Sequence, residues 1–217
     1  VGINAVEQYI GDYALEQNFA FQAGPDTGKR VAIVGGGPAG LSAAYQLRRK
    51  GHAVTLFEDH AELGGMAKYG VPGYRLPRKH LDGEINRIIA MGVEVRLNTR
   101  IGTDVALNDL ETGFDAVLLA IGCKAGLSLP VPGANAPNCI SGVAFLEAFN
   151  QGRLKTVSGR VVVVGGGDTS IDVATVARRL GHLEHSKPTE FELAITGQIA
   201  HDVAEISVKQ GAEVTLT

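Results

Sequence analysis

Residues 31–40 read Val31-Ala32-Ile33-Val34-Gly35-Gly36-Gly37-Pro38-Ala39-Gly40, an apolar run that leads directly into a glycine fingerprint. The apolar run predicts a buried parallel strand, and the glycines predict a tight turn into a helix. Gly35 would permit the turn, Gly37 would let the backbone approach a pyrophosphate, and Gly40 would let the helix pack closely on the strand. Because the first N–H groups of such a helix bind anions, this stretch favours a dinucleotide-binding fold.

The residues that follow complete one β-α-β unit. A helix is predicted over 38–50, because Gly51 is a typical residue at a helix end, and a strand is predicted over 53–58. Glu58 ends that strand, where an acidic side chain accepts hydrogen bonds from ribose hydroxyls. A free 2′-hydroxyl fits this position, which favours FAD or NAD over NADP at the first site. The alternative is a surface glutamate at a strand end.

A second fingerprint of the same type lies at residues 161–170, which read Val-Val-Val-Val-Gly-Gly-Gly-Asp-Thr-Ser. It again predicts a buried parallel strand, a turn and a helix. Ser170 takes the place of the third glycine and is small enough to keep helix and strand close. Asp168 and Asp172 fall in the first turns of the helix, where they either stabilise its N-terminus or contact a nicotinamide nucleotide. Two fingerprints suggest two dinucleotides, and hence hydride transfer between a flavin and a nicotinamide.

The composition narrows the class of protein. Of the 217 residues, 45% are hydrophobic and 20% are charged, as in ordinary globular proteins. The net charge of −3 argues against nucleic-acid binding, and no apolar run approaches the ~20 residues that span a bilayer. The cysteines Cys123 and Cys139 form no C-x-x-C, which argues against a self-contained disulfide reductase. They are expected to be reduced thiols in a cytoplasmic protein.

The organisation predicted is α/β, with tandem Rossmann-like dinucleotide-binding domains. A helical lead-in is expected over 1–29, an FAD-binding domain over 30–155, and the start of an NAD(P)H-binding domain over 156–217. The first residue is not Met, and the last residues resemble a strand with nothing after it. The chain is therefore expected to be cut at both ends, which leaves both domains partial.

Hydrophobic periodicity predicts the remaining elements. Helices are expected over 5–20 (one or two short ones), 79–91, 143–150, 170–180 and 199–210, and strands over 93–97, 114–121 and 213–217. The strand over 114–121 should be buried. Gly181 should end the helix before it, and residues 182–198 look inserted because they do not fit a compact β-α unit.

Residues 64–77 are rich in Gly, Pro and Tyr and are predicted to form a functional loop. Its glycines would allow close approach to a flat ring. Arg75, Arg78 and Lys79 could hold a phosphate or balance the negative charge of a flavin. The alternative is a solvated loop with scattered charges.

No catalytic or metal-binding set is predicted. His182, His185 and His201 lie near one another in the sequence, but nothing supports the further ligands that a metal site needs. Cys123 is expected to be a buried small residue. Hydride transfer needs no side-chain acid or base, which fits the lack of a catalytic triad.

Several motifs together resemble one family. They are Gly35–Gly40 with Glu58, Leu63-Gly64-Gly65, Tyr69–Pro72 with Arg75–Pro77, Phe114–Val117 with Ala120–Gly122, Leu129–Gly133, and Gly165–Thr169 with Asp172. The chain resembles the small subunit of NADPH-dependent glutamate synthase. It also resembles the FAD/NAD(P)H subunits of ferredoxin-linked transhydrogenases, dihydropyrimidine dehydrogenase and anaerobic oxidoreductase complexes.

The resemblance implies where the cofactors would bind. It places FAD against Gly35, Gly37, Gly40, Glu58, Gly65, Ala120, Ile121 and Gly122, and NAD(P)H against Gly165, Gly167, Asp168 and Thr169. The further cofactor-binding residues that it suggests are Pro38, Ala39, Gly64, Met66, Tyr69, Gly70, Val71, Arg75, Leu76 and Ser170.

The function implied is that of an FAD-dependent NAD(P)H oxidoreductase subunit. In this family hydride moves from nicotinamide to flavin, and single electrons then leave to an iron–sulfur subunit or domain of a larger complex. The resemblance leaves NAD and NADP both open. The alternative is a non-catalytic FAD-binding scaffold within a larger redox complex.

Overall fold

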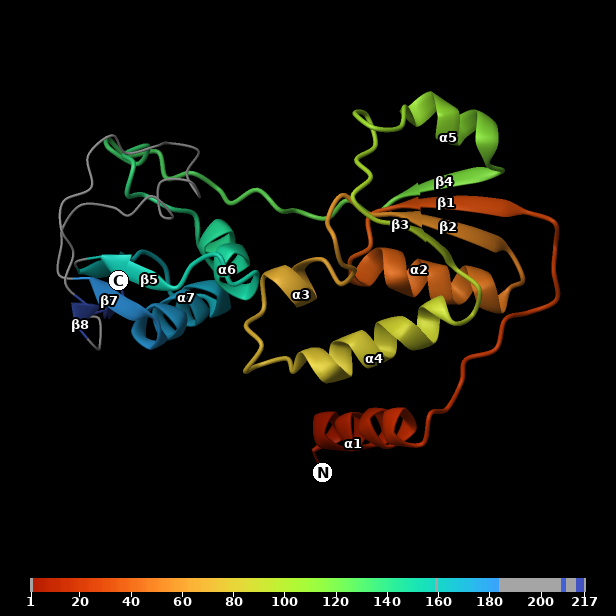
Figure 1. Ribbon diagram of the computed structural model, residues 1–217, viewed down its shortest axis with the longest axis horizontal. Helices are drawn as coiled ribbons and strands as arrows, with labels where there is room; N and C mark the ends of the chain where they lie inside the picture. Colours follow the sequence, from red (N-terminus) through yellow and green to blue (C-terminus); the bar gives the residue numbers. More distant parts are fainter. Residues whose placement is uncertain (1, 159, 184–207, 210–213, 217) are drawn as a thin grey trace. The chain divides into compact units, whose positions relative to one another are not determined.

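The computed structural model describes residues 2–158, 160–183, 208–209 and 214–216 (Figure 1). The chain forms two compact units. The first comprises Val1–Lys68 and Leu76–Gly122, and the second comprises Tyr69–Arg75 and Cys123–Thr217. Each unit buries its own hydrophobic core.

The first unit is built on a four-stranded sheet with strand order β3-β2-β1-β4. The strands are β1 (Arg30–Val34), β2 (Ala53–Phe57), β3 (Glu94–Arg96) and β4 (Ala116–Leu119), and all of their pairings are parallel. This pairing confirms the predicted β-α-β unit. In a parallel sheet the carboxyl ends of the strands lie at one edge, which is where ligands bind in such folds.

Helices cover both faces of this sheet (Figure 1). Helices α2 (Pro38–Arg49) and α4 (Arg78–Ile89) lie on one face, and α5 (Leu107–Gly113) lies on the other. Ile33 and Ile85 belong to the core on the first face, and Phe57 and Leu110 belong to the core on the second. Burial of these apolar side chains stabilises the layered arrangement and holds the strand ends in place.

Two further helices belong to the first part of the chain. Helix α1 (Ile3–Glu16) is one continuous helix, and it contacts α4, where Asp12 Oδ1 lies 2.7 Å from His80 Nδ1. Helix α3 (Met66–Tyr69) is a single turn inside residues 64–77, so the prediction that this stretch is loop throughout was wrong. The turn forms because Ala67 N and Lys68 N donate to the carbonyl oxygens of Gly64 and Gly65.

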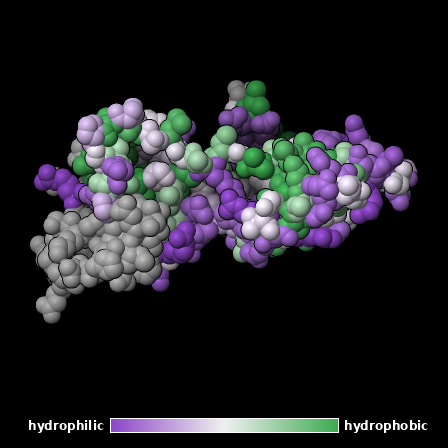
Figure 2. All heavy atoms as spheres, turned by 90° about the horizontal axis from the view of Figure 1, so that it is seen from above, coloured by the Kyte–Doolittle hydropathy of each residue, from purple (hydrophilic) through white to green (hydrophobic). Residues whose placement is uncertain are grey.

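Strand β4 corrects another prediction. Residues 114–121 were expected to be a buried strand, but the strand covers only Ala116–Leu119, and Leu118 and Leu119 are 39% and 58% exposed. The reason is the position of β4, which is one of the two edge strands of the sheet and has β1 on one side only. Figure 2 shows hydrophobic side chains at the surface of this unit.

The second unit pairs β6 (Val161–Val163) in parallel with β9 (Val214–Leu216). Helix α6 (Gly142–Asn150) packs against α7 (Asp168–Arg179), and their buried residues form one core. A separate sheet joins β5 (Thr156–Ser158), β7 (Gly181–Leu183) and β8 (Val208–Lys209). The predicted strand over 213–217 is thus confirmed over the residues that the structure describes.

Two predictions for this unit need correction, those for Val161–Val164 and for the helix over 199–210. Val161–Val164 was expected to be buried, but Val162 is 58% and Val164 is 63% exposed, and only Val163 is buried. The helix predicted to end at Gly181 does end there, because α7 ends at Arg179 with Leu180 as its cap, and Gly181 then begins β7. Of the helix predicted over 199–210, residues 208–209 form β8, and 199–207 lie outside the described residues, as does 184–198 of the predicted insertion.

The division between the units falls after Gly122 rather than between residues 155 and 156. Helix α6 belongs with the second unit because Phe145 and Leu146 join the core that contains Val173 and Val176 of α7. Sequence periodicity gives no signal for such long-range packing.

None of the helices in the described residues is both long and apolar enough to cross a membrane.

Candidate functional site

The first glycine turn lies between the end of β1 and the start of α2. Gly35 has a φ of +110°, and a Cβ on it would collide with the carbonyl oxygen of Ala120. A Cβ on Gly40 would collide with the carbonyl oxygen of Gly35. Only glycine fits either position, because the backbone itself occupies the space that a side chain would need.

Gly37 is different, because its surroundings are open. A Cβ on it would meet only the Cα of Gly65, at 3.6 Å, and its φ of −77° suits any residue. Gly37 also precedes α2, which has no side-chain cap and no acidic residue in its first turn. The N-terminal N–H groups of α2 are therefore left for an anion, and space remains above Gly37 for one to approach.

A second pair of glycines packs against this turn. Gly64 N donates to the carbonyl oxygen of Gly36 at 2.8 Å, and a Cβ on Gly65 would lie only 2.7 Å from Gly37 Cα. Gly64 and Gly65 both have positive φ values, +121° and +50°. The two turns form a surface lined by backbone rather than by side chains, of the kind that approaches a pyrophosphate closely.

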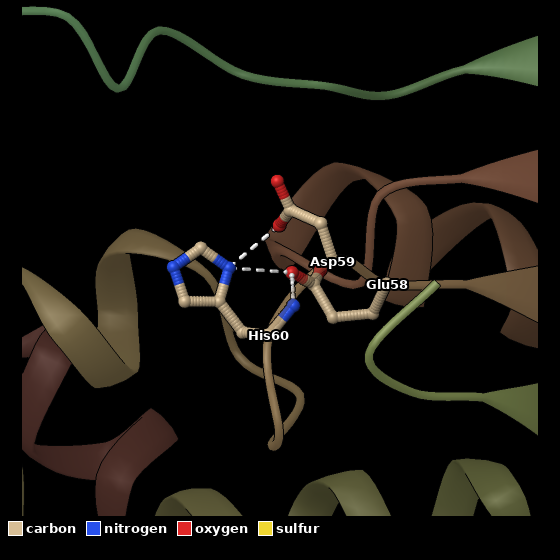
Figure 3. Close-up of side chains that lie close together, drawn as sticks. All are labelled: Glu58, Asp59 and His60. Carbon is tan, nitrogen blue, oxygen red and sulfur yellow. Dashed lines mark hydrogen bonds and ion pairs between the residues drawn. The ribbon is translucent and has the colours of Figure 1, made fainter. Parts of the chain in front are cut away.

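Glu58 follows β2 and is buried, at 3% exposure (Figure 3). Its Oε2 accepts from Gly36 N at 2.7 Å, and its Oε1 accepts from His60 N at 3.0 Å. The interpretation of Glu58 as a surface glutamate is therefore wrong. The carboxylate holds the glycine turn in place, and the contact predicted with a ribose remains a prediction.

Asp59 and His60 complete a compact polar cluster with Glu58. His60 Nδ1 lies 2.9 Å from Glu58 Oε1 and 2.6 Å from Asp59 Oδ1, so one ring nitrogen faces both carboxylates (Figure 3). The three groups are close enough to hold a metal ion in principle. Their mutual contacts explain the arrangement without one, since the Nδ1–H tautomer of His60 donates toward both carboxylates.

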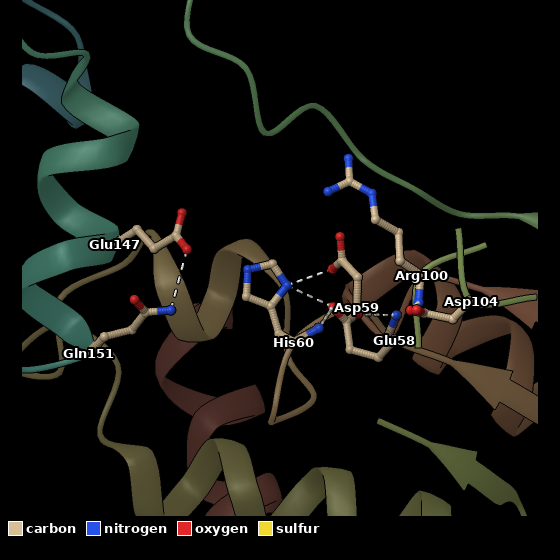
Figure 4. Close-up of polar contacts among 8 residues, drawn as sticks. Glu58, Asp59, His60, Arg100, Asp104, Glu147 and Gln151 are labelled. Carbon is tan, nitrogen blue, oxygen red and sulfur yellow. Dashed lines mark hydrogen bonds and ion pairs between the residues drawn. The ribbon is translucent and has the colours of Figure 1, made fainter. Parts of the chain in front are cut away.

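The loop that follows β3 fixes the position of this cluster. Asn98 N donates to His60 O at 3.0 Å, and Thr99 N donates to Glu58 O at 2.9 Å. Figure 4 shows the turn next to this loop, in which Arg100 N donates to Asp104 Oδ2 at 2.7 Å. The same figure draws a separate hydrogen bond of the second unit, between Gln151 and Glu147 of the α6 region. Backbone contacts of this kind hold Glu58 in one orientation.

The other residues predicted at the first site lie at its edges. Ala120 N donates to Val34 O at 2.7 Å, Ile121 is 62% exposed, and Gly122 has a φ of +67°. Pro38 and Ala39 begin α2 and are exposed, and Met66 begins α3. The structure thus gathers the first glycine turn, Glu58, residues 64–65 and residues 120–122 at the carboxyl ends of β1, β2 and β4.

Arg78 and Lys79, which were considered as phosphate ligands, begin α4. Arg78 Nη1 donates to the carbonyl oxygens of Ala67 and Leu76, and burial lowers the pKa of its guanidinium. Lys68 is held by Asp82 and Glu62. Burial alone would lower the pKa of Lys68, but these carboxylates outweigh it and raise the pKa.

The second glycine turn repeats the first between β6 and α7. Gly165 has a φ of +127°, and a Cβ on it would lie 2.6 Å from Ser170 Oγ, so Ser170 fills the place of the third glycine closely. A Cβ on Gly167 would meet nothing within 4 Å. Helix α7 also lacks a side-chain cap, although Asp168 in its first turn adds a negative charge that α2 does not have.

Residues Tyr69–Arg75, which we call the strap, belong to the second unit and contact its helices. Asn150 Nδ2 of α6 donates to Tyr69 O at 2.7 Å, and Arg75 Nε lies 2.8 Å from Asp172 Oδ1 of α7. Arg179 lies over the ring of Tyr74, with its Cζ 3.8 Å from the ring centroid. Gly70 is buried and Val71 is half-buried.

Sequence reasoning missed several of these residues. His60 carries no motif that links it to Glu58. Arg179 had a usable signal, because it lies seven residues after Asp172 and so shares a face of α7 with it. Cys123, expected to be buried, is exposed, because it begins the connection that leaves the first unit.

Comparison with known proteins adds the family. The family model for pyridine nucleotide-disulphide oxidoreductases matches residues 29–216. The NADP(+)-dependent formate dehydrogenase subunit beta of Moorella thermoacetica is 48% identical over 161 residues, which are 73% of this chain and 23% of that protein. The glutamate synthase [NADPH] small chain of Mycobacterium tuberculosis is 35% identical over 196 residues, with 83% of this chain and 40% of that protein covered.

Among solved structures, Mycobacterium tuberculosis FprA in complex with NADPH aligns with a TM-score of 0.61 and 25% identity. The alignment covers 68% of this chain and 36% of FprA. The chain therefore spans less than half the length of each of these proteins. The resemblance drawn from the motifs is confirmed, as is the α/β Rossmann-like fold, and the chain belongs to the pyridine nucleotide-disulphide oxidoreductase family.

Proposed function

We propose that this chain is the dinucleotide-binding part of an FAD-dependent NAD(P)H oxidoreductase subunit. One observation carries the proposal: the arrangement of parallel strand, glycine turn and uncapped helix N-terminus occurs twice, at β1–α2 and at β6–α7. Each arrangement suits the pyrophosphate of one dinucleotide. Membership of the pyridine nucleotide-disulphide oxidoreductase family supports pairing a flavin with a nicotinamide.

The first turn is proposed to bind FAD. The open space beside Gly37 and the uncapped start of α2 suit the pyrophosphate, and the buried Glu58 suits a ribose hydroxyl because each carboxylate oxygen has more than one lone pair. The proposed FAD-binding residues are Gly35, Gly37, Pro38, Ala39, Gly40, Glu58, Gly64, Gly65, Met66, Tyr69, Gly70, Val71, Leu76, Ala120, Ile121 and Gly122.

The second turn is proposed to bind the nicotinamide dinucleotide through Gly165, Gly167, Asp168, Thr169 and Ser170. Gly167 is more open than Gly37, so a phosphate has room to approach the start of α7. The names of the formate dehydrogenase and glutamate synthase relatives and of the FprA complex specify NADP or NADPH. These names favour NADPH as the first nucleotide to test here.

The flavin, when bound, accepts a hydride and releases electrons one at a time. The residues of this chain bind and orient the two cofactors, and none of them has to move a proton. Both relatives are named as subunits, which supports a partner in a larger complex, and we propose that this partner carries an iron–sulfur centre. The unpaired Cys123 and Cys139 are consistent with the cytoplasmic location that we propose.

Gly37 allows a direct test of the FAD site because, unlike Gly35, it has room for a side chain. Gly37→Ala should fold, because both φ and space allow a methyl group there, but the methyl group should keep the pyrophosphate away. The matched control is Gly113→Ala on α5, where a Cβ would also meet nothing within 4 Å. Flavin content should fall in the Gly37 variant alone. Equal flavin content in both variants, or a colourless parent protein, would contradict the proposed FAD site, and a colourless parent protein would favour a scaffold that binds no flavin.

A further inference from the structure

Helix α7 begins, directly after the second glycine turn, with two acidic residues on one face. Asp168 is the first residue of the helix and Asp172 follows one turn later, so the two side chains lie on the same side. Asp168 is exposed, whereas Asp172 is buried at 6% exposure. The start of a helix attracts anions, but two carboxylates there repel a phosphate that approaches the same place. An anion site at the start of α7 therefore needs a positive charge that balances them.

The buried carboxylate of Asp172 is balanced by an ion pair rather than by hydrogen bonds. Among the residues that the structure describes, none donates a hydrogen bond to Asp172 Oδ1. Arg75 Nε lies 2.8 Å from this oxygen. A buried carboxylate without a compensating charge is strongly unfavourable, because water cannot solvate it. Arg75 therefore supplies the positive charge that Asp172 needs.

The strap brings Arg75 to α7, and further contacts within the second unit hold the strap there. Asn150 Nδ2 of α6 donates to the carbonyl oxygen of Tyr69, at the start of the strap. Near its end, the ring of Tyr74 lies against Arg179, whose Cζ is 3.8 Å from the ring centroid. The strap, α6, α7 and the second glycine turn all belong to the second unit. The charge of Arg75 is thus part of the same unit as the proposed nucleotide site.

Asp172 lies near enough to the start of α7 to influence a phosphate there. It is five residues after Gly167, which is about 7.5 Å along the helix axis at the usual rise per residue. Its Cα–Cβ bond also tilts toward the start of the helix. At this distance near a protein surface, one uncompensated unit charge changes the affinity for another by about tenfold or more. The state of the Arg75–Asp172 pair should therefore be measurable as nucleotide affinity.

We propose that Arg75 is a positioning residue for the nicotinamide dinucleotide, which neutralises Asp172 and so allows the start of α7 to bind the pyrophosphate. This inference rests on the proposed function of the second glycine turn. It assigns Arg75, which the sequence suggested as a phosphate or flavin ligand, to the second site. Arg75 acts there through Asp172 rather than by touching the phosphate, because its Nε faces the buried carboxylate.

The test compares five variants of the full-length protein. Arg75→Gln leaves Asp172 uncompensated, Asp172→Asn removes the buried charge with little change of shape, and Arg75→Gln/Asp172→Asn removes both charges. Arg75→Lys keeps the positive charge, and the 43% exposed side chain of Arg75 gives room for either replacement. The matched control is Arg178→Gln, which removes one positive charge from an exposed position in the last turn of the same helix.

The Kd for NADP+ is measured by calorimetry with the flavin oxidised, so that no hydride transfer accompanies binding. Arg75→Gln should raise this Kd about tenfold or more, because the charge of Asp172 then repels the phosphates. The double variant should return to within about threefold of the parent, since no buried charge is left to neutralise. Arg75→Lys and Arg178→Gln should also stay within about threefold. Asp172→Asn should bind NADP+ at least as tightly as the parent.

Thermal unfolding of each variant separates binding from folding. Arg75→Gln should lower the melting temperature, and the double variant should recover it, because a buried charge without a partner destabilises the fold. If Arg75→Gln does not fold, Asp172→Asn and the double variant still decide, since both lack the buried charge and both should bind NADP+.

Three results would overturn the inference. A Kd that stays raised in the double variant would make Arg75 a direct phosphate ligand. A raised Kd in Asp172→Asn would make Asp172 a nucleotide ligand, and an unchanged Kd in a folded Arg75→Gln protein would leave the pair a structural role alone. In each of these cases the parent still binds NADP+, so the proposed function stands. A parent that binds neither NADP+ nor NAD+ would refute the proposed function and this inference together.

Discussion

Replacing Glu58 with glutamine tests how the first glycine turn is held. Glu58 Oε2 accepts from Gly36 N, and Oε1 accepts from His60 N and faces His60 Nδ1. Glutamine keeps one acceptor oxygen and replaces the other with an NH2 donor. Whichever way the amide turns, a donor then faces a donor at one of these contacts, because the side chain is buried and water cannot take the place of the lost acceptor.

The magnitude follows from these contacts. A buried N–H that loses its acceptor costs about 1–3 kcal/mol, and a hydrogen bond to a charged group contributes about 1.5–3 kcal/mol. We therefore expect Glu58→Gln to lower the free energy of unfolding of the first unit by about 2 kcal/mol. Because about 1.4 kcal/mol corresponds to a factor of ten, the Kd for FAD should rise at least about tenfold if the turn must be rebuilt on binding.

The assay is urea unfolding of flavin-free protein, followed by circular dichroism, with flavin binding measured separately by fluorescence. The matched control is Glu111→Gln on α5, an exposed position where the change should stay within about 0.5 kcal/mol. If the two variants unfold at the same urea concentration, then Glu58 does not hold the glycine turn and the reasoning fails.

Three further predictions concern other parts of the chain. Gly35→Ala should prevent the first unit from folding, seen as loss of soluble protein, because a Cβ there collides with Ala120 O at a φ of +110°; a variant with the parent's melting temperature would contradict this. Gly167→Val should fold and keep its flavin, because the φ of −80° and the open surroundings of Gly167 allow a side chain there. The new side chain should keep the phosphate away from the start of α7 and so raise the Kd for NADPH at least about tenfold. Titration with NADPH measures the Kd, and an unchanged Kd would mean that the nucleotide binds elsewhere. Hydrogen bonds from Arg96 and Thr55 hold the pKa of Glu94 below its ordinary value of 4.5. Ionised Glu94 therefore stabilises the fold above pH 4.5, and this stabilisation is lost as the pH falls through the lowered pKa. Glu94→Gln should make the melting temperature less dependent on pH in this acidic range, and the same dependence of melting temperature on pH in variant and parent would refute the assignment.

The first β-α-β unit was predictable because its signals are local. The apolar run at Val31–Val34, the glycines and the helix end at Gly51 each act on adjacent residues, and the structure reproduces β1, α2 and β2 within a residue or two. The motif also indicated that Glu58 belongs near the turn. The motif could not predict the burial of Glu58 or the role of His60. Both depend on the loop at residues 98–99, whose backbone N–H groups donate hydrogen bonds to Glu58 and His60.

The strap and β4 show the limit more clearly. The sequence of residues 64–77 indicates an unusual segment, but its attachment to Asn150, Asp172 and Arg179 joins positions about 80 to 105 residues apart and has no periodic signal. Leu118 and Leu119 resemble a buried strand because apolar runs usually are buried. Their exposure follows from the place of β4 at the edge of the sheet, which only the strand order reveals.

The most direct test of the central claim is the visible spectrum of the full-length protein during an anaerobic titration with NADPH and, separately, NADH. Two dinucleotide sites that exchange a hydride predict oxidised-flavin bands that bleach with at least one of the two nucleotides. The bands should bleach several-fold more slowly in Gly167→Val than in the parent at a nucleotide concentration near the Kd of the parent. A protein that carries no flavin, or a flavin that neither nucleotide bleaches, would contradict the account.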